Sequence, residues 1–148
     1  MRISKLTDYG VLVMNQLAVR PQRGMSASEL AQRLELPVPT VSKILKSLTQ
    51  AGLLESRRGP HGGYLLKRAP QQISLGEILD ALEGPLALTE CSAERSECAI
   101  EAQCSMRRQW RGINRIIHDL LSQIDLARLN QGEAVVSLKG LGLKQSDL

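Results

Sequence analysis

Hydrophobic residues recur every three or four positions through the first fifty residues, and this period predicts consecutive helices. The first helix is expected over residues 4–19 and should end before Pro21. A second, shorter helix is expected over residues 27–34. Ser26 and Glu29 have the spacing of a capping box at its start, in which each side chain bonds the other residue's backbone N–H.

A third helix is expected from Pro39 to just before Gly52, and its two faces differ in character. The apolar stripe that should be buried consists of Val41, Ile44, Leu45 and Leu48. The opposite face carries Pro39, Ser42, Lys43, Lys46 and Gln50. Two short helices joined by a tight turn, the second one cationic, are typical of a helix-turn-helix. An ordinary amphipathic helix with a solvated polar face is the alternative.

Two strand-like runs over residues 53–57 and 64–67 follow this helix, separated by a segment rich in Gly and Pro. This pattern predicts a hairpin directly after the candidate recognition helix, which is the position of a wing. Arg57, Arg58 and His61 lie at its tip. Cationic side chains on a thin loop suit insertion into a narrow, electronegative minor groove.

Helical periodicity returns after residue 74, in a helix capped by Ser74 and ended by Gly84. Farther along, apolar residues recur at alternating intervals of three and four: Trp110, Ile113, Ile117, Leu120, Ile124 and Ala127. This seam predicts a long C-terminal helix that packs against a partner helix, and we favour dimerisation over packing on the chain's own core. The fold is therefore expected to be mainly α-helical with a small β wing.

Three regions are expected along the chain. Residues 1–70 should form a winged helix-turn-helix that binds DNA. Residues 71–130 should hold a cysteine segment and the dimerisation helix, and residues 131–148 a loosely ordered tail.

Composition limits the class of protein. The 148 residues suffice for one domain, and no apolar stretch is long enough to span a membrane. Residues 1–70 hold 11 Lys and Arg against 4 Asp and Glu, a net charge of +7, whereas residues 71–148 hold 8 against 11, or −3. The positive half favours a polyanion as partner. With no secretory signal at the start, we expect a cytoplasmic protein.

All three cysteines lie within 14 residues, at Cys91, Cys98 and Cys104. An odd number in a chain without a secretory signal argues against a disulfide framework. Three thiolates on a loop suit an iron-sulfur cluster first, zinc second and a thiol redox switch third. A fourth ligand would come from Asp8, His61, His118, a nearby Glu or a small molecule. A cysteine-nucleophile enzyme is disfavoured, because neither of the two histidines adjoins a cysteine.

Several segments together resemble the Rrf2 family of bacterial regulators, which includes IscR, NsrR and RirA. They are SKLTDYG, PTVSKILKSLTQAGLL, RGPHGGYLL, ISLGEILDALEGPL and the three cysteines. LALTECS and CSMRRQWRGIN are most similar to the subgroup that regulates the SUF iron-sulfur assembly operon. The resemblance spans about residues 1–130. It implies a homodimer that binds a palindromic operator and carries a cluster near the dimerisation helix.

The resemblance implies that Cys91, Cys98 and Cys104 hold a 4Fe-4S or 2Fe-2S cluster. IscR-like members place a fourth-ligand His where this chain has Arg107. NsrR-like members use an acidic residue of the partner's first helix, which Asp8 matches. The expected function is repression of SUF genes. The same fold sensing redox state or metal through thiols or zinc, or nitric oxide through the cluster, is the alternative.

The expected DNA contacts fall into two groups. Thr40, Ser42 and Lys43 should meet base edges. Lys46, Arg57 and Arg58 should contact phosphates or the minor groove, and Pro39 and His61 should also lie on the DNA-binding surface.

Overall fold

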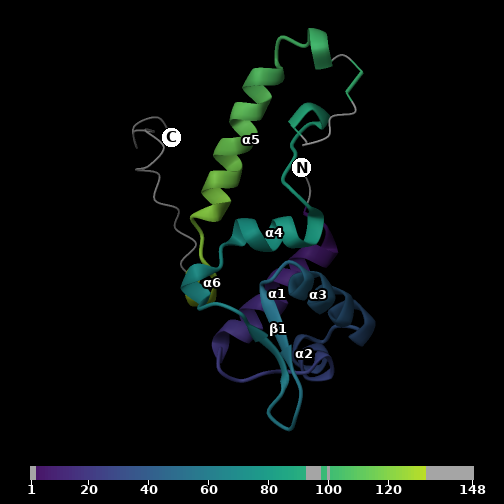
Figure 1. The fold of residues 1–148 in the computed structure, drawn as a ribbon, viewed down its shortest axis with the longest axis vertical. Coiled ribbons are helices and arrows are strands. Elements are labelled where there is room, and N and C mark those ends of the chain that lie inside the picture. Colours follow the sequence, from purple (N-terminus) through teal and green to yellow (C-terminus); the bar gives the residue numbers. More distant parts are fainter. Residues whose placement is uncertain (1–2, 93–97, 100, 133–148) are drawn as a thin grey trace.

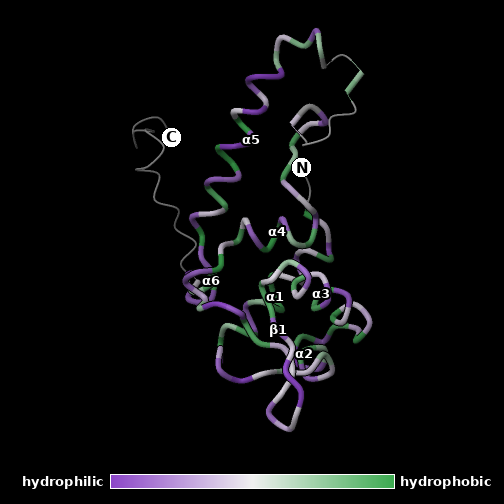
Figure 2. Tube along the Cα trace, viewed as in Figure 1, coloured by the Kyte–Doolittle hydropathy of each residue, from purple (hydrophilic) through white to green (hydrophobic). Residues whose placement is uncertain are grey.

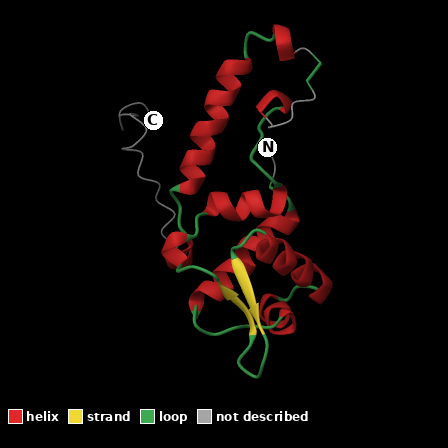
Figure 3. Cartoon of the chain, in the orientation of Figure 1, coloured by secondary structure: helices red, strands yellow, loops and turns green. Residues whose placement is uncertain are grey.

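A computed structural model of the chain describes residues 3–92, 98–99 and 101–132. The helices are α1 (Lys5–Val19), α2 (Ala27–Leu34), α3 (Val38–Gln50), α4 (Leu75–Glu83), α5 (Arg107–Ser122) and α6 (Leu126–Gln131). Two strands, β1 (Leu54–Arg57) and β2 (Gly63–Leu66), form an antiparallel hairpin. Short 3-10 turns occur at η1 (Pro70–Gln72), η2 (Glu90–Ser92) and η3 (Glu101–Gln103). The predicted class, helices with one small wing, is confirmed (Figure 3).

Serine side chains start three of the helices, as the sequence indicates. The Ser26 hydroxyl accepts the Glu29 N–H at 3.1 Å, and the Glu29 carboxylate accepts the Ser26 N–H at 2.7 Å. Ser74 and Glu77 form the same capping box at the start of α4. Ser4 caps α1 by accepting the Thr7 N–H at 3.2 Å. Each cap satisfies backbone donors that have no partner inside the helix.

One continuous apolar core holds the helices together. The fully buried side chains of α3 pack against α1, α2 and α4. Ile73, Ile78 and Leu126 belong to the same core, although they come from beyond residue 70. The core therefore crosses the expected regional boundary, while a functional division of the chain at that residue stays a prediction. Residues 133–148, which hold most of the expected tail, lie outside the described residues.

The predicted apolar seam is wrong in its last part. Helix α5 ends at Ser122, so Ile124 and Ala127 do not extend its apolar face. The chain turns there because Asp125 caps α6, accepting the Arg128 N–H at 2.9 Å. Leu126 then donates its N–H to the Ile73 carbonyl at 2.9 Å and is fully buried. Tertiary contacts with the core therefore override the sequence period.

Helix α5 extends away from the rest of the molecule (Figure 1). No residue on it is buried, and the exposed fractions of Trp110, Ile113 and Ile116 are 37%, 41% and 48%. Apolar and polar residues alternate along its trace (Figure 2). An exposed stripe of large apolar side chains on one helix is typical of a surface that another protein surface covers.

We expect the unfolding free energy to fall as the pH drops below about 4.5. The Ser4 N–H donates to the Glu83 carboxylate at 2.7 Å, and this bond holds the Glu83 pKa below its ordinary value of 4.5. A lowered folded-state pKa adds stability above the ordinary value, and this stability is lost as pH falls through the folded pKa. Denaturant titrations at several pH values should show a shallower acid decline in Glu83→Gln. An identical decline in both proteins would contradict the assignment.

Candidate nucleic-acid interface and cysteine segment

Helix α3 has the two faces that its sequence predicts. The predicted apolar stripe is fully buried: Val41, Ile44, Leu45 and Leu48 are all 0% exposed. The opposite face is exposed: Pro39, Ser42, Lys43, Lys46 and Gln50. Thr40 is half-buried at the edge between the two faces. The helix thus presents a cationic surface on a rigid core.

A tight turn sets α3 against α2. Glu35 adopts the left-handed conformation, with φ of +54°, and its N–H bonds the Ala31 carbonyl. The Leu36 N–H also bonds the Ala31 carbonyl, at 3.0 Å. This pattern ends α2 within one residue and lets α3 start at Val38. A glutamate does not signal this turn, because glycine or asparagine is the usual residue at such a position.

The predicted hairpin is present and has an additional attachment. Leu54 pairs with Leu66 and Arg57 with Gly63, which leaves the tip at residues 58–62. Met25 also pairs with Tyr64 through backbone hydrogen bonds of 3.1 and 2.8 Å. The segment before α2 thus adds an isolated β-bridge to the wing. Single-residue pairing leaves no periodic trace in a sequence.

The cations of the wing differ in their availability. The Arg57 guanidinium lies 2.6 Å from the Glu55 carboxylate, and both side chains are exposed. Surface ion pairs contribute little stability, so a phosphate can replace this partner at small cost. Arg58 and His61 are exposed at the tip. The predicted cationic tip is therefore present, with Arg57 held by an intramolecular pair in the free protein.

The cysteine segment connects α4 to α5 at the end of the molecule remote from the wing (Figure 1). The backbone of Cys91 lies in η2, while its side chain is outside the described part. Cys98 and Cys104 are half-buried. Among the described residues, no group of three ligand-type side chains is assembled. The donor set fits an iron-sulfur cluster by its chemistry, since thiolates are the usual ligands of such clusters.

Asn114 fastens this segment to α5. Its amide nitrogen donates to the Leu86 carbonyl at 2.7 Å, and its amide oxygen accepts the Leu88 N–H at 3.0 Å. The two bonds attach the backbone just before Cys91 to the middle of α5. Helix α5 also packs against η2. Nothing in the sequence marks this residue, because a lone Asn on a helix has many ordinary roles.

The two histidines occupy separate places in the described part of the chain. His118 places Nε2 3.0 Å from the Asp80 carboxylate, which ties α5 to α4. Its Nδ1 lies 3.5 Å from the Ser122 hydroxyl. His61 lies in the wing, at the other end of the molecule from the cysteine segment (Figure 1). A ligand role for either histidine stays a prediction.

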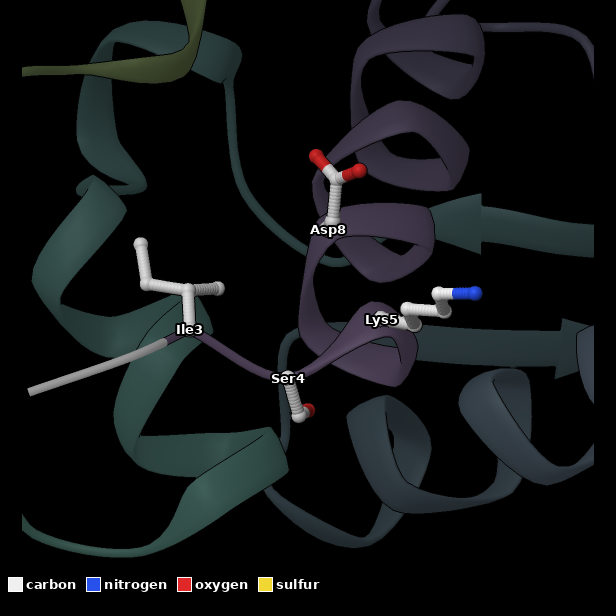
Figure 4. A pocket seen from close by; sticks show the side chains of 4 residues that line it. All are labelled: Ile3, Ser4, Lys5 and Asp8. Carbon is white, nitrogen blue, oxygen red and sulfur yellow. The ribbon is translucent and has the colours of Figure 1, made fainter.

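Asp8 is exposed on α1, in a shallow hollow with Ile3, Ser4 and Lys5 (Figure 4). The Lys5 side chain points away from the Asp8 carboxylate in this view. Pairing of these two side chains, the ordinary alternative for Asp8, is not observed in the described structure. The carboxylate is open to a ligand or a second chain.

Comparisons with known proteins agree on one family. The family model for Rrf2, described as iron-dependent transcriptional regulator, matches residues 3–132. An HTH-type transcriptional regulator of Neisseria meningitidis serogroup A is 31% identical over 127 residues, covering 85% of each chain.

Two solved structures share the fold. CymR, the global cysteine regulator of B. subtilis, is 27% identical with a TM-score of 0.70, covering 89% of this chain and 98% of its own. IscR of T. potens is 27% identical with a TM-score of 0.68, covering 98% and 93%. The two scores are nearly equal, so the fold alone does not select one regulator type. Within the described residues, no helix has the length and apolar character needed to cross a bilayer.

Proposed function

Because the chain belongs to the Rrf2 family of transcriptional regulators, we propose that it is a homodimeric repressor of SUF iron-sulfur assembly genes. A cluster on Cys91, Cys98 and Cys104 would set its affinity for a palindromic operator, and the protein would act in the cytoplasm. The observation that carries this proposal is a three-thiol segment fastened to an exposed apolar helix. The related proteins are transcriptional regulators and not enzymes.

The contacts of α5 supply the proposed coupling. The cluster, when bound, would join the three thiolates into one rigid centre. Asn114 transmits the position of that segment to α5, and the bond between His118 and Asp80 transmits it to α4. Helix α4 packs directly on α1 and α3. Cluster loss would then change how two recognition helices span their half-sites.

A second chain would complete the structure in two places. The exposed stripe of α5 would pair with its counterpart in the dimer. Asp8, open to solvent in one chain, would serve as the fourth ligand to the partner's cluster. This arrangement agrees with the departure from the IscR-like pattern, in which Arg107 occupies the position of a histidine ligand.

Thiol or zinc sensing on the same fold is the second candidate. It is favoured by the likeness to CymR, whose solved structure is described as that of a cysteine regulator. Nitric oxide would be an alternative signal acting through a cluster. Both candidates share the DNA-binding half, so only the cysteine chemistry separates them.

Anaerobic purification tests which chemistry is present. We expect a coloured protein with visible charge-transfer absorption and comparable iron and sulfide contents. A colourless, zinc-loaded and iron-free dimer would favour the second candidate. Selection of genomic DNA fragments by the same preparation should return a palindromic site upstream of assembly genes.

Lys46→Ala should weaken binding to all DNA sequences alike. The side chain is exposed on the outer face of α3, where we expect it to contact a phosphate. Loss of one phosphate contact should reduce the slope of log affinity against log salt by about one unit. Gln50→Ala, on the same face but uncharged, should leave the slope unchanged. An effect of Lys46→Ala confined to one operator variant would show base recognition instead.

A further inference from the structure

Three arginines line a small hollow. None of them is among the DNA contacts expected on α3 and the wing. Arg20 follows α1, Arg23 lies in the connection to α2, and Arg33 lies in the last turn of α2. The hollow measures about 90 Å³, and its other lining residues are Gln16, Val19 and Met25. Three separate elements thus bring positive charge to one point. Helical periodicity groups side chains within one helix only, so it gives no sign of such a cluster.

The guanidinium groups of these three arginines are available to bind an anion. Within the described ranges, none of the three has a side-chain hydrogen bond or an ion pair with a carboxylate. Arg57, Arg68 and Arg128 are different, because each pairs with an acidic neighbour. Unpaired arginines gathered at one site repel one another, and an anion relieves that repulsion.

Among the described residues, Glu29 is an acidic group whose charge interacts with those of Arg23 and Arg33. Its carboxylate already accepts the Ser26 N–H at 2.7 Å in the capping box of α2. That bond is the largest cause of its lowered pKa, and the charges of Arg23 and Arg33 lower it further. The single negative charge of Glu29 does not balance the three positive charges of the guanidinium groups, so the site stays positive. Planar guanidinium groups suit the oxygen atoms of a phosphate.

The position of the hollow favours DNA as the source of that phosphate. Met25, which lines the hollow, is bonded through its backbone to Tyr64, close to the tip of the wing. The wing and the connection between α1 and α2 lie at the same end of the molecule, away from α5 (Figure 1). Arg33 belongs to the first helix of the helix-turn-helix, and such helices cross the DNA backbone.

We propose that Arg20, Arg23 and Arg33 form a phosphate clamp that holds the DNA backbone beside the segment read by α3 and the wing. The clamp reads no bases. It fixes the orientation of the recognition helix and contributes affinity for any duplex. This inference rests on the proposed DNA-binding function and assigns a further contact to it.

Salt-dependent binding of the full-length protein to its selected operator tests the clamp. Replacing all three arginines by glutamine should lower operator affinity roughly 10- to 100-fold near 0.1 M salt and reduce the salt slope by about two to three units. Arg33→Gln alone should remove about one unit. Arg115→Gln, the matched loss of one exposed charge on α5, should leave the slope unchanged. A variant in which lysine replaces all three arginines should retain most of the wild-type salt slope.

Uncharged methylphosphonate linkages in the operator identify the contacted phosphates. Wild-type protein should lose affinity when linkages outside the half-site are neutralised, and the triple glutamine variant should lose little more. Equal affinity and slope in wild type and triple glutamine variant would overturn the clamp. Stabilisation of DNA-free wild type by inorganic phosphate, lost in the variant while DNA binding is unchanged, would also overturn it. If the wild-type protein bound all DNA sequences equally well, the proposed function itself would be refuted.

Discussion

Replacing Cys91, Cys98 and Cys104 together by serine should abolish the visible absorption of the anaerobically purified protein and its iron and sulfide content. Operator affinity should fall by roughly 5- to 150-fold, the usual range for coupling between two sites in one protein. The physical reason is that the thiolates are the proposed cluster ligands and their segment is bonded to α5 through Asn114. Fluorescence anisotropy with labelled operator measures the loss.

A neighbouring substitution controls for local disturbance. Ser105 is exposed beside Cys104 and carries a hydroxyl that is not a proposed ligand. Ser105→Ala should therefore keep the absorption and the operator affinity of the wild type. An unchanged affinity in the triple serine variant, under every iron and oxygen condition, would remove the cysteines from the regulatory account.

Gly63→Ala should produce the second large effect, on both stability and DNA binding. Gly63 has φ of +114°, and an added Cβ would lie 2.6 to 2.9 Å from backbone atoms of Met25. A side chain there opposes the pairing of Met25 with Tyr64, which attaches the wing. We expect the unfolding free energy to fall by roughly 2 to 4 kcal/mol and operator affinity to fall with it.

Gly59 offers a matched comparison in the same hairpin. Its φ of +109° imposes a similar backbone strain, but a Cβ there would meet nothing within 4 Å. Gly59→Ala should therefore cost about 1 to 2 kcal/mol, from strain alone. Chemical denaturation of both variants isolates the cost of the contact with Met25. Equal losses in the two variants would show that the close approach to Met25 is unimportant.

The elements that the sequence predicted are those determined by local chemistry. The serine caps at Ser26 and Ser74 and the buried stripe of α3 follow from neighbours within one or two helical turns. The wing follows from its Gly and Pro content. In each case the interacting residues are close in sequence, so pattern and structure coincide.

The features that the sequence missed depend on distant contacts. The end of α5 is fixed by a bond between Leu126 and Ile73, residues more than fifty positions apart. Met25 joins the wing through Tyr64, and Asn114 holds the backbone of Leu86 and Leu88. None of these pairs creates a period that a single sequence displays.

The candidate ligands illustrate the same distinction. The sequence placed three cysteines in one segment, because they are neighbours along the chain. It left Asp8, His61 and His118 open as fourth ligands, and the structure commits His118 to Asp80 and places His61 in the wing. Asp8 stays the proposed fourth ligand, because its exposed carboxylate is open to a second chain.

Control of DNA binding by cluster occupancy is tested most directly on one preparation of the wild-type protein. Operator affinity is measured by anisotropy in the cluster-loaded protein, again after anaerobic removal of iron and sulfide, and again after reconstitution. We expect tight operator binding by the cluster-loaded protein and an affinity at least about fivefold lower after removal of the cluster. Reconstitution should restore the original affinity. The same dissociation constant in all three states, with iron and sulfide contents verified in each, would contradict the account.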